Sequence, residues 1–274
     1  MTQYLIVIAA PDMVNLFLLC IFLKPTVFTF PHCGRVSKEM DSILKMHEIN
    51  RIIGGRETAP QGFPWMAYYK IYEQKRDTFC GATIITKWFA LTAAHCTEIS
   101  SAKASEVWVG RHQSNQGGEG HIVDSIIKDP NRNRRTKSGD LSLLQLRTPI
   151  LFTETVHPVC LPSGPEDTPA PGAQGIAMGW GNTETGKYSS IATTLRFVWL
   201  DIISLERCRR KLREWDIPGA NRSKFLHESN LCTLTNNKDS CHGKMAAWQK
   251  HQVSGDSGGP LVVRKDDSFY LVQS

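Results

Sequence analysis

A histidine, an aspartate and a serine stand in short motifs that suit nucleophilic catalysis. His95 lies in the run Thr-Ala-Ala-His-Cys, Asp140 begins the strand-like run Asp-Leu-Ser-Leu-Leu, and Ser257 lies within Gly-Asp-Ser-Gly-Gly-Pro. A serine hydroxyl is a weak nucleophile that needs an imidazole as general base, and the imidazole needs a carboxylate to fix its tautomer. Glycines beside the serine let main-chain N–H groups approach a substrate oxyanion closely. Together the motifs indicate chemistry at a serine nucleophile.

The serine motif carries most of this inference. The chain has 9 His and 26 Asp and Glu residues, so a single histidine or aspartate is far more often structural or solvated than catalytic. The six-residue serine motif is different, because its chance frequency is below roughly one in 10⁷ per position.

The elements that must position these residues are predicted to be mainly strands. Short apolar segments, separated by clusters of Gly, Pro, Ser and Asn, are typical of an all-β sandwich or barrel. They cover residues 82–85, 107–109, 141–146, 176–178 and 197–203. Only Ser204–Trp215 predicts a helix, with Ser204 as N-cap. The polar residues 35–50 predict an exposed connecting segment, and the Pro/Gly-rich residues 162–175 predict a linker between two β units.

Composition excludes several classes of protein. With 274 residues, 41% hydrophobic and 21% charged, the chain is long enough for a real core and is not a disordered, collagen-like or coiled-coil sequence. A formal charge of +6 is too small to indicate nucleic-acid binding. Eight cysteines without a C-x-x-C spacing favour disulfides over a zinc ribbon. The run His-Glu-Ile-Asn-Arg at 47–51 lacks the second histidine of a zinc peptidase. No metal and no cofactor are therefore expected.

In the chain order His, Asp, Ser the sequence resembles the trypsin/chymotrypsin family of serine endopeptidases, from about Cys33 to its end. Further matching runs are Arg-Ile-Ile-Gly-Gly at 51–55, Pro-Val-Cys-Leu-Pro at 158–162, Gly-Trp-Gly at 179–181, Asn-Leu-Cys-Thr at 230–233 and Lys-Asp-Ser-Cys at 238–241. The resemblance implies an all-β fold of two packed antiparallel six-stranded β-barrels, with the second barrel C-terminally truncated. The peptidase domain would cover 52–274, with the first barrel at about 52–162 and the second at about 163–274.

The resemblance also assigns the roles of the reaction. Ser257 would be the nucleophile, His95 the general base and then acid, and Asp140 the residue that orients the imidazole. The N–H groups of Gly255 and Ser257 would form the oxyanion hole. Asp239 would lie at the base of the specificity pocket and select protein or peptide substrates with Arg or Lys at the cleaved position.

The same resemblance implies a zymogen. Cleavage between Arg51 and Ile52 by an activating protease would free an α-amino group that pairs with Asp256 and orders the oxyanion loop. The implied disulfides are Cys33–Cys160, Cys80–Cys96 and Cys208–Cys232. The first would keep residues 31–51 attached as a propeptide or light chain. Protein inhibitors are possible partners of such an enzyme.

The N-terminal segment and Asn221 bear on location. Residues 1–30 predict a signal peptide, with an apolar part at 13–23 that is too short to span a bilayer, so we expect secretion. A start at Met13 would give a cleaner signal, and an uncleaved membrane anchor is the alternative. The sequon Asn-Arg-Ser at 221–223 predicts glycosylation.

Several features depart from the family pattern. About twelve extra residues, 243–254, separate the specificity pocket from the serine motif, and only 17 residues follow Ser257. One family bridge is replaced by Gly175 and Val263, and Cys20 and Cys241 are left without an implied partner. These departures keep open an inactive or truncated homologue that acts as a binding or decoy protein.

Two basic clusters are more simply solvated surface than a site for a heparin-like polyanion, which remains the alternative. They comprise Arg132, Arg134, Arg135 and Lys137, and then Arg207, Arg209, Arg210, Lys211 and Arg213.

Overall fold

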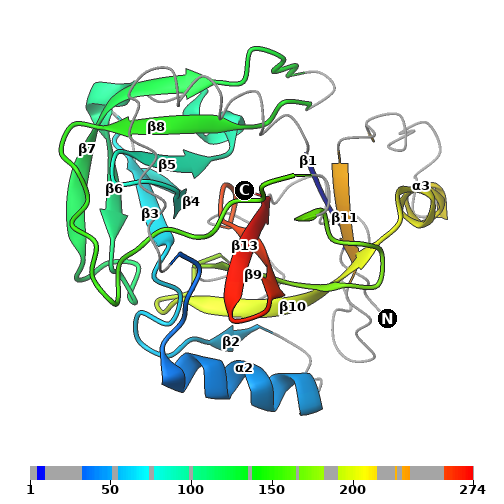
Figure 1. Cartoon of the computed structure of the whole chain (residues 1–274). Coiled ribbons are helices and arrows are strands. Elements are labelled where there is room, and N and C mark those ends of the chain that lie inside the picture. The colour runs from blue at the N-terminus through cyan, green and yellow to red at the C-terminus, as the bar shows by residue number, and fades with distance from the viewer. Residues whose placement is uncertain are drawn as a thin grey trace.

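Strands dominate the fold and form two units, a closed barrel and a second sheet (Figure 1). The computed structural model describes residues 5–9, 33–50, 55–73, 77–98, 101–134, 138–164, 167–181, 191–214, 226, 230–234 and 256–273. The expected all-β fold with two β units is confirmed.

The first unit is a closed barrel of six antiparallel strands in the order β3-β4-β5-β8-β7-β6. Its interior is filled by fully buried side chains that include Ala67, Tyr69, Val107 and Leu144. The strands and short 3-10 helices of this unit are β3 (Met66–Ile71), β4 (Thr78–Ile84), β5 (Phe89–Thr92), η1 (Ala94–Thr97), η2 (Ala102–Ala104), β6 (Ser105–Val109), β7 (Glu119–Lys128) and β8 (Ser142–Leu146).

The second unit is a sheet in the order β1-β11-β10-β9-β12-β13, and β2 pairs with β10 beside this path. Within the described part of the chain this sheet does not close into a barrel. Its strands are β1 (Leu5–Ala9), β2 (Arg56–Glu57), β9 (Gln174–Gly179), β10 (Arg196–Ile203), β11 (Asn230–Leu234), β12 (Leu261–Lys265) and β13 (Ser268–Gln273). β2 thus joins the second sheet although it lies in the range expected for the first barrel.

A continuous apolar core joins the two units. Trp65, the residue before β3, packs on Phe269 of β13, with ring centroids 5.7 Å apart, and Phe63 meets Phe197 of β10 at 5.8 Å. All four side chains are buried. The barrel and the sheet are therefore held together by packed aromatic rings, which fixes how residues from each unit face one another.

The expectation of an exposed connection at residues 35–50 is wrong. Helix α2 (Lys38–Asn50) covers most of this range and lies beside β2 (Figure 1). Met40 and Leu44, one turn apart on the same face, have no exposed surface and belong to the core shared by the two units. The Ser37 hydroxyl caps the helix by accepting the Met40 N–H at 3.1 Å. Ile43 of the same helix is partly buried against this core, so a few apolar residues anchor an otherwise polar helix.

The second helix, α3 (Leu205–Glu214), confirms the predicted helix after Ser204. The Ser204 hydroxyl accepts the Arg207 N–H at 3.2 Å and acts as the N-cap. Cys208, fully buried on the inner face of α3, joins Cys232 of β11.

Among the described residues, the disulfides are Cys33–Cys160, Cys80–Cys96 and Cys208–Cys232, the pairs implied by the resemblance. Gly175 and Val263, which replace a further family bridge, are register partners on β9 and β12. Their pairing fits the joint loss of both cysteines.

The N-terminal strand β1 pairs antiparallel with β11, so that Leu5 faces Leu234 and Ala9 faces Asn230. This strand lies inside the segment 1–30 that predicts a signal peptide, and that prediction stays untested. Among the described residues, no helix has both the length and the apolar character needed to cross a membrane.

Candidate active site

His95 is placed by the barrel. It lies in the 3-10 helix η1, three residues after β5 ends at Thr92. Cys96 beside it is tied by the disulfide to Cys80 on β4. Thr97 anchors the end of η1 to β8, because its hydroxyl lies 3.0 Å from the hydroxyl of Ser142 in a buried contact. The imidazole thus projects from a short turn that is anchored to two strands.

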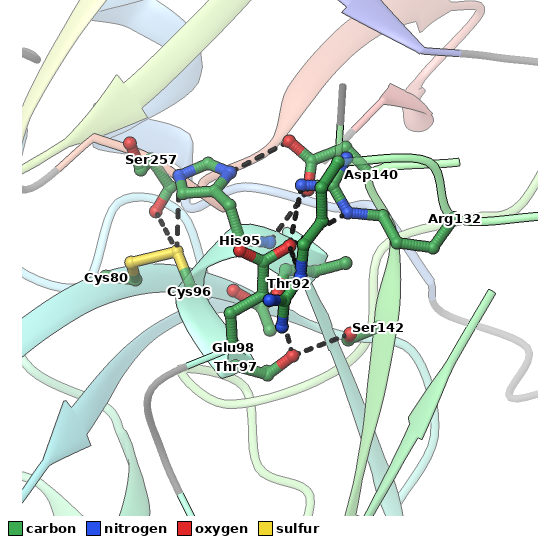
Figure 2. A network of polar contacts seen from close by, with 12 residues as sticks. Cys80, Thr92, His95, Cys96, Thr97, Glu98, Arg132, Asp140, Ser142 and Ser257 are labelled. Atoms are coloured by element: carbon green, nitrogen blue, oxygen red, sulfur yellow. Dashed lines mark hydrogen bonds and ion pairs between the residues drawn. A yellow bond between two sulfur atoms is a disulfide. The ribbon is translucent and has the colours of Figure 1, made fainter. Parts of the chain in front are cut away.

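Asp140 reaches His95 because the strands that carry them are neighbours. β5 pairs with β8 so that Thr92 faces Ser142, and Asp140 lies two residues before Ser142. Asp140 Oδ2 is 2.8 Å from His95 Nδ1, and Asp140 Oδ1 accepts the His95 main-chain N–H at 2.8 Å (Figure 2). A carboxylate accepts but does not donate, so Nδ1 carries the proton and Nε2 is free to act as a base.

The charge state of Asp140 suits this role. Burial by itself raises the pKa of this carboxyl, but the hydrogen bonds and charge of His95, together with the charge of Arg132, outweigh the burial and leave the pKa below its usual value. The carboxylate is therefore ionised at neutral pH and can stabilise an imidazolium at His95.

Ser257 belongs to a turn that docks on the barrel through main-chain contacts. The Gly81 N–H on β4 donates to the Ser257 carbonyl at 2.8 Å. Gly258 has a φ of +80°, and a Cβ there would clash with Thr92 Oγ1 and lie 2.6 Å from the Gly81 carbonyl. A Cβ on Gly81 would lie 2.6 Å from Gly259 Cα. Glycine is needed on both sides because backbone meets backbone at this contact.

Ser257 and His95 lie next to each other across the Cys80–Cys96 disulfide. Cys96 Sγ is 3.7 Å from His95 Nε2 and 3.7 Å from the Ser257 carbonyl oxygen (Figure 2). A disulfide sulfur has no proton to donate, so these are packing contacts. Within the described part of the chain, Ser257 Oγ makes no hydrogen bond, to His95 Nε2 or elsewhere. The structure therefore brings the serine beside the histidine without joining them.

Asp256, which precedes the serine, packs against the second sheet. Its Oδ1 accepts the Gly181 N–H at 2.6 Å, and a Cβ on Gly179 or Gly181 would collide with its carboxylate. Asp256 is exposed as a residue, but its carboxylate is packed against this main chain. Burial raises the pKa of the Asp256 carboxyl, although the Gly181 N–H acts in the opposite direction. No cation pairs with this carboxylate among the described residues.

Other predicted site residues lie outside the described residues. They are Arg51 and Ile52 of the expected activation site, Gly255 of the oxyanion hole, Asp239 of the pocket and Asn221 of the sequon. Cys20, Cys241 and the extra residues 243–254 lie outside them as well. No three His, Cys, Asp or Glu side chains gather as a metal site in the part of the chain that the structure describes.

One residue of the site was missed by sequence reasoning. Arg132, taken as part of a solvated basic cluster, is only 11% exposed in its side chain and contacts both Glu98 and Asp140. No spacing or motif in the sequence connects Arg132 with His95. Only the fold of the loop before Asp140 brings it there.

Comparison with known proteins identifies the family. The profile of the Trypsin family matches residues 52–272. Trypsin epsilon of Drosophila erecta is 30% identical over 231 residues, which cover 84% of this chain and 79% of that protein. The crystal structure of a scabies mite inactivated protease paralogue, S-D1, is similar with a TM-score of 0.62 and 19% identity, over 79% of this chain and 83% of the other. The last likeness shows the fold alone. The chain belongs to the trypsin family.

Proposed function

We propose that this protein is a serine endopeptidase, made as a zymogen, that cleaves after Arg or Lys through an acyl-enzyme. The observation that carries the proposal is the pair of 2.8 Å contacts from Asp140 to His95, with Ser257 next to the imidazole across the Cys80–Cys96 disulfide. His95 Nε2 would take the proton of Ser257 Oγ as the hydroxyl attacks the substrate carbonyl. His95 would then return that proton to the leaving amine.

The open gap between Ser257 and His95 fits an uncut precursor. Catalytic hydrogen bonds are often long before the substrate complex forms. Asp256 supplies a mechanism for closing the gap, because its packed carboxylate has a main-chain donor but no cationic partner in the described residues. An α-amino group freed at Ile52 by cutting after Arg51 would supply the missing charge. Movement of Asp256 toward it would turn the N–H groups of Gly255 and Ser257 toward the oxyanion.

The same proposal includes the substrate specificity, the partners and the location of the protein. Asp239 would pair with the Arg or Lys of a protein or peptide substrate, and an Arg at position 51 implies a trypsin-like activating protease. Protein inhibitors would compete with substrate for the same residues. Three disulfides suit an oxidising, extracellular setting, and secretion through residues 1–30 is part of the proposal.

The alternative is a family member without catalysis that acts as a binding or decoy protein. One specific observation favours it, namely that Ser257 Oγ is not hydrogen-bonded to His95. The similar scabies mite structure is itself named as an inactivated protease paralogue.

Hydrolysis and covalent labelling distinguish the two functions. The purified chain is cut after Arg51 with a trypsin-like protease, which is then removed, and is assayed on peptide amides with Arg, Lys or Leu at the cleaved position. We expect turnover of the Arg and Lys amides, loss of all turnover in Ser257→Ala, and no activation in Arg51→Gln. A fluorophosphonate probe should label Ser257 only after the cut. Wild-type activity no higher than that of Ser257→Ala, with no labelling, would leave the binding protein as the function.

A further inference from the structure

The loop before Asp140 presents Arg132 to the site on well-defined main-chain bonds. The Arg132 N–H donates to the Asp129 carbonyl at 3.0 Å, and the Asn133 N–H donates to the Ser138 carbonyl at 3.0 Å. Gly139, with a φ of +60°, packs against the main chain of Asn131 and Arg132. Arg132 is thus fixed at its Cα by the turn that leads into Asp140.

The guanidinium of Arg132 joins the histidine element to the aspartate. Its Nε and Nη2 both donate to Glu98 Oε1, at 3.2 and 2.9 Å, and Nη2 also lies 3.5 Å from Asp140 Oδ1 (Figure 2). Glu98 follows η1 directly, and its own N–H points to the His95 carbonyl at 3.5 Å. The planar guanidinium therefore spans from the turn that carries His95 to the carboxylate that orients it.

Burial makes this contact different from an ordinary surface ion pair. The side chains of Arg132, Glu98 and Asp140 are 11%, 22% and 23% exposed. Arg134, two residues on, also pairs with Glu98 at 3.3 Å, but it is 71% exposed and does not contact Asp140. Exposed pairs are screened and contribute little, whereas partly buried pairs are screened much less.

We infer that Arg132 is a positioning residue, which holds the Asp140 carboxylate in the orientation that receives the His95 N–H and balances part of its charge. The inference rests on the proposed function for its catalytic meaning. In the described part of the chain, the polar contacts of the Asp140 carboxylate are with His95 and Arg132 alone, so Arg132 is the one residue besides His95 itself that orients this carboxylate.

The charged groups around the imidazole give the sign of the effect. Among the described residues, Asp140 faces His95 directly, Arg132 stands behind Asp140, Glu98 behind Arg132, and Arg134 at the rim. The positive charge of Arg132 opposes the protonation of His95 through Asp140. Without it, the Asp140 carboxylate attracts an imidazolium at His95 more strongly, while the His95 main-chain N–H still holds Oδ1, so the loss of charge outweighs the loss of orientation in Arg132→Gln.

The decisive measurement is the titration of His95 by NMR in the uncut Ser257→Ala chain with labelled histidine, assigned with a His95→Gln variant. We expect Arg132→Gln to move the midpoint of the His95 titration upward by about one pH unit. Arg132→Lys, which keeps the charge, should bring the midpoint most of the way back to that of the parent. Arg134→Gln, the matched control, should leave the midpoint within about 0.2 pH unit of the parent.

Activity gives the second readout. In the cut enzyme, Arg132→Gln should lower kcat about tenfold with KM unchanged, and the acid limb of kcat/KM should move to higher pH in parallel with the NMR midpoint. Arg132→Met keeps an apolar side chain in place of the arginine methylenes, and the same measurements are made on it if Arg132→Gln does not fold.

The outcomes separate this inference from the proposed function. A His95 midpoint in folded Arg132→Gln or Arg132→Met equal to the parent's overturns the inference, whatever the activity. If Arg132→Gln raises the His95 midpoint but the cut wild-type chain never hydrolyses peptides, the proposed function fails, while the placement of the His95–Asp140 pair by Arg132 stands.

Discussion

At the scale of single residues, the position of Ser257 depends on glycines that carry no chemistry. Gly81, Gly258 and Gly259 let the serine turn lie directly on β4, where the Gly81 N–H holds the Ser257 carbonyl. The distance between Ser257 and His95 is therefore set by backbone contact between the two units. Side-chain size at these positions decides whether the site can assemble.

Gly258→Ala tests this contact, with Gly172→Ala as the matched control. Both glycines have positive φ, +80° and +98°, but a Cβ on Gly172 meets nothing within 4 Å. In the control, the unfolding free energy should fall by about 1–2 kcal/mol, because alanine is strained at positive φ. In Gly258→Ala, the unfolding free energy should fall by about 1–3 kcal/mol more, because the added methyl clashes with Thr92 and Gly81. Denaturant unfolding of both variants measures the difference, and equal losses would contradict the close contact.

Asp256→Asn tests the packed carboxylate through pH. Burial raises the pKa of Asp256 in the folded chain, so the protonated carboxyl is favoured by folding. The stability that this carboxyl contributes is fully present below its pKa in the unfolded chain, about 3.9, and is lost as pH rises through its pKa in the folded chain. Asparagine keeps an acceptor for the Gly181 N–H without a charge. The uncut variant should melt at a higher temperature than the wild type at pH 7 and at the same temperature near pH 3. A difference that does not change with pH would rule out the carboxylate as its cause.

At the scale of elements, the sequence predicts strands better than the helix that precedes the peptidase domain. Apolar runs such as 107–109 and 141–146 fall in β6 and β8, and Ser204 caps α3 as expected. Helix α2 was missed because Met40 and Leu44 are its fully buried residues, too few to stand out from a polar stretch. Its Ser37 cap and acidic first turn were the signals available.

The candidate site shows the same limit. The motifs around His95, Asp140 and Ser257 identify residues whose chemistry is local, so sequence alone could select them. Arg132 acts through a loop whose shape depends on Gly139 and on main-chain bonds, and nothing in its neighbours' identities specifies that geometry.

Leu44→Ala tests whether α2 is part of the core. Leu44 has no exposed surface, so its truncation should cost about 2–5 kcal/mol of unfolding free energy. Met46 on the same helix is 63% exposed, and Met46→Ala should change stability by less than about 0.5 kcal/mol. Parallel urea titrations give both values, and similar costs for the two variants would show that the helix is not anchored through Leu44.

At the scale of the whole molecule, the segment before Arg51 is tied to the rest in two independent ways. The Cys33–Cys160 disulfide is one, and it is flanked by main-chain bonds from Gly34 to Pro158 and from Phe269 to Gly34. The other is the buried face of α2, which is assisted by Asp41 pairing with Arg264 at 3.0 Å. Cutting the chain after Arg51 should therefore leave one compact particle.

The double variant Cys33→Ser, Cys160→Ser separates the two ties. After the cut, the segment that ends at Arg51 should co-elute with the peptidase domain in native size-exclusion chromatography and should separate from it in guanidinium. The cut wild type should need guanidinium together with a reductant. Loss of the segment from the double variant under native conditions would mean that the disulfide alone holds it.

The end of α2 also bears on the proposed cut after Arg51. The helix runs to Asn50, the residue before Arg51, whereas peptidases bind their substrates as extended strands. Helical residues on one side of the cut must unwind first, so the observed rate is the cleavage rate of the open form multiplied by the fraction of time that the last turn is open. Terminal turns fray at small cost, and this fraction rises with temperature. Under the proposed activation, the lifetime of the uncut chain is then set by a local equilibrium of the chain itself as well as by the amount of activator.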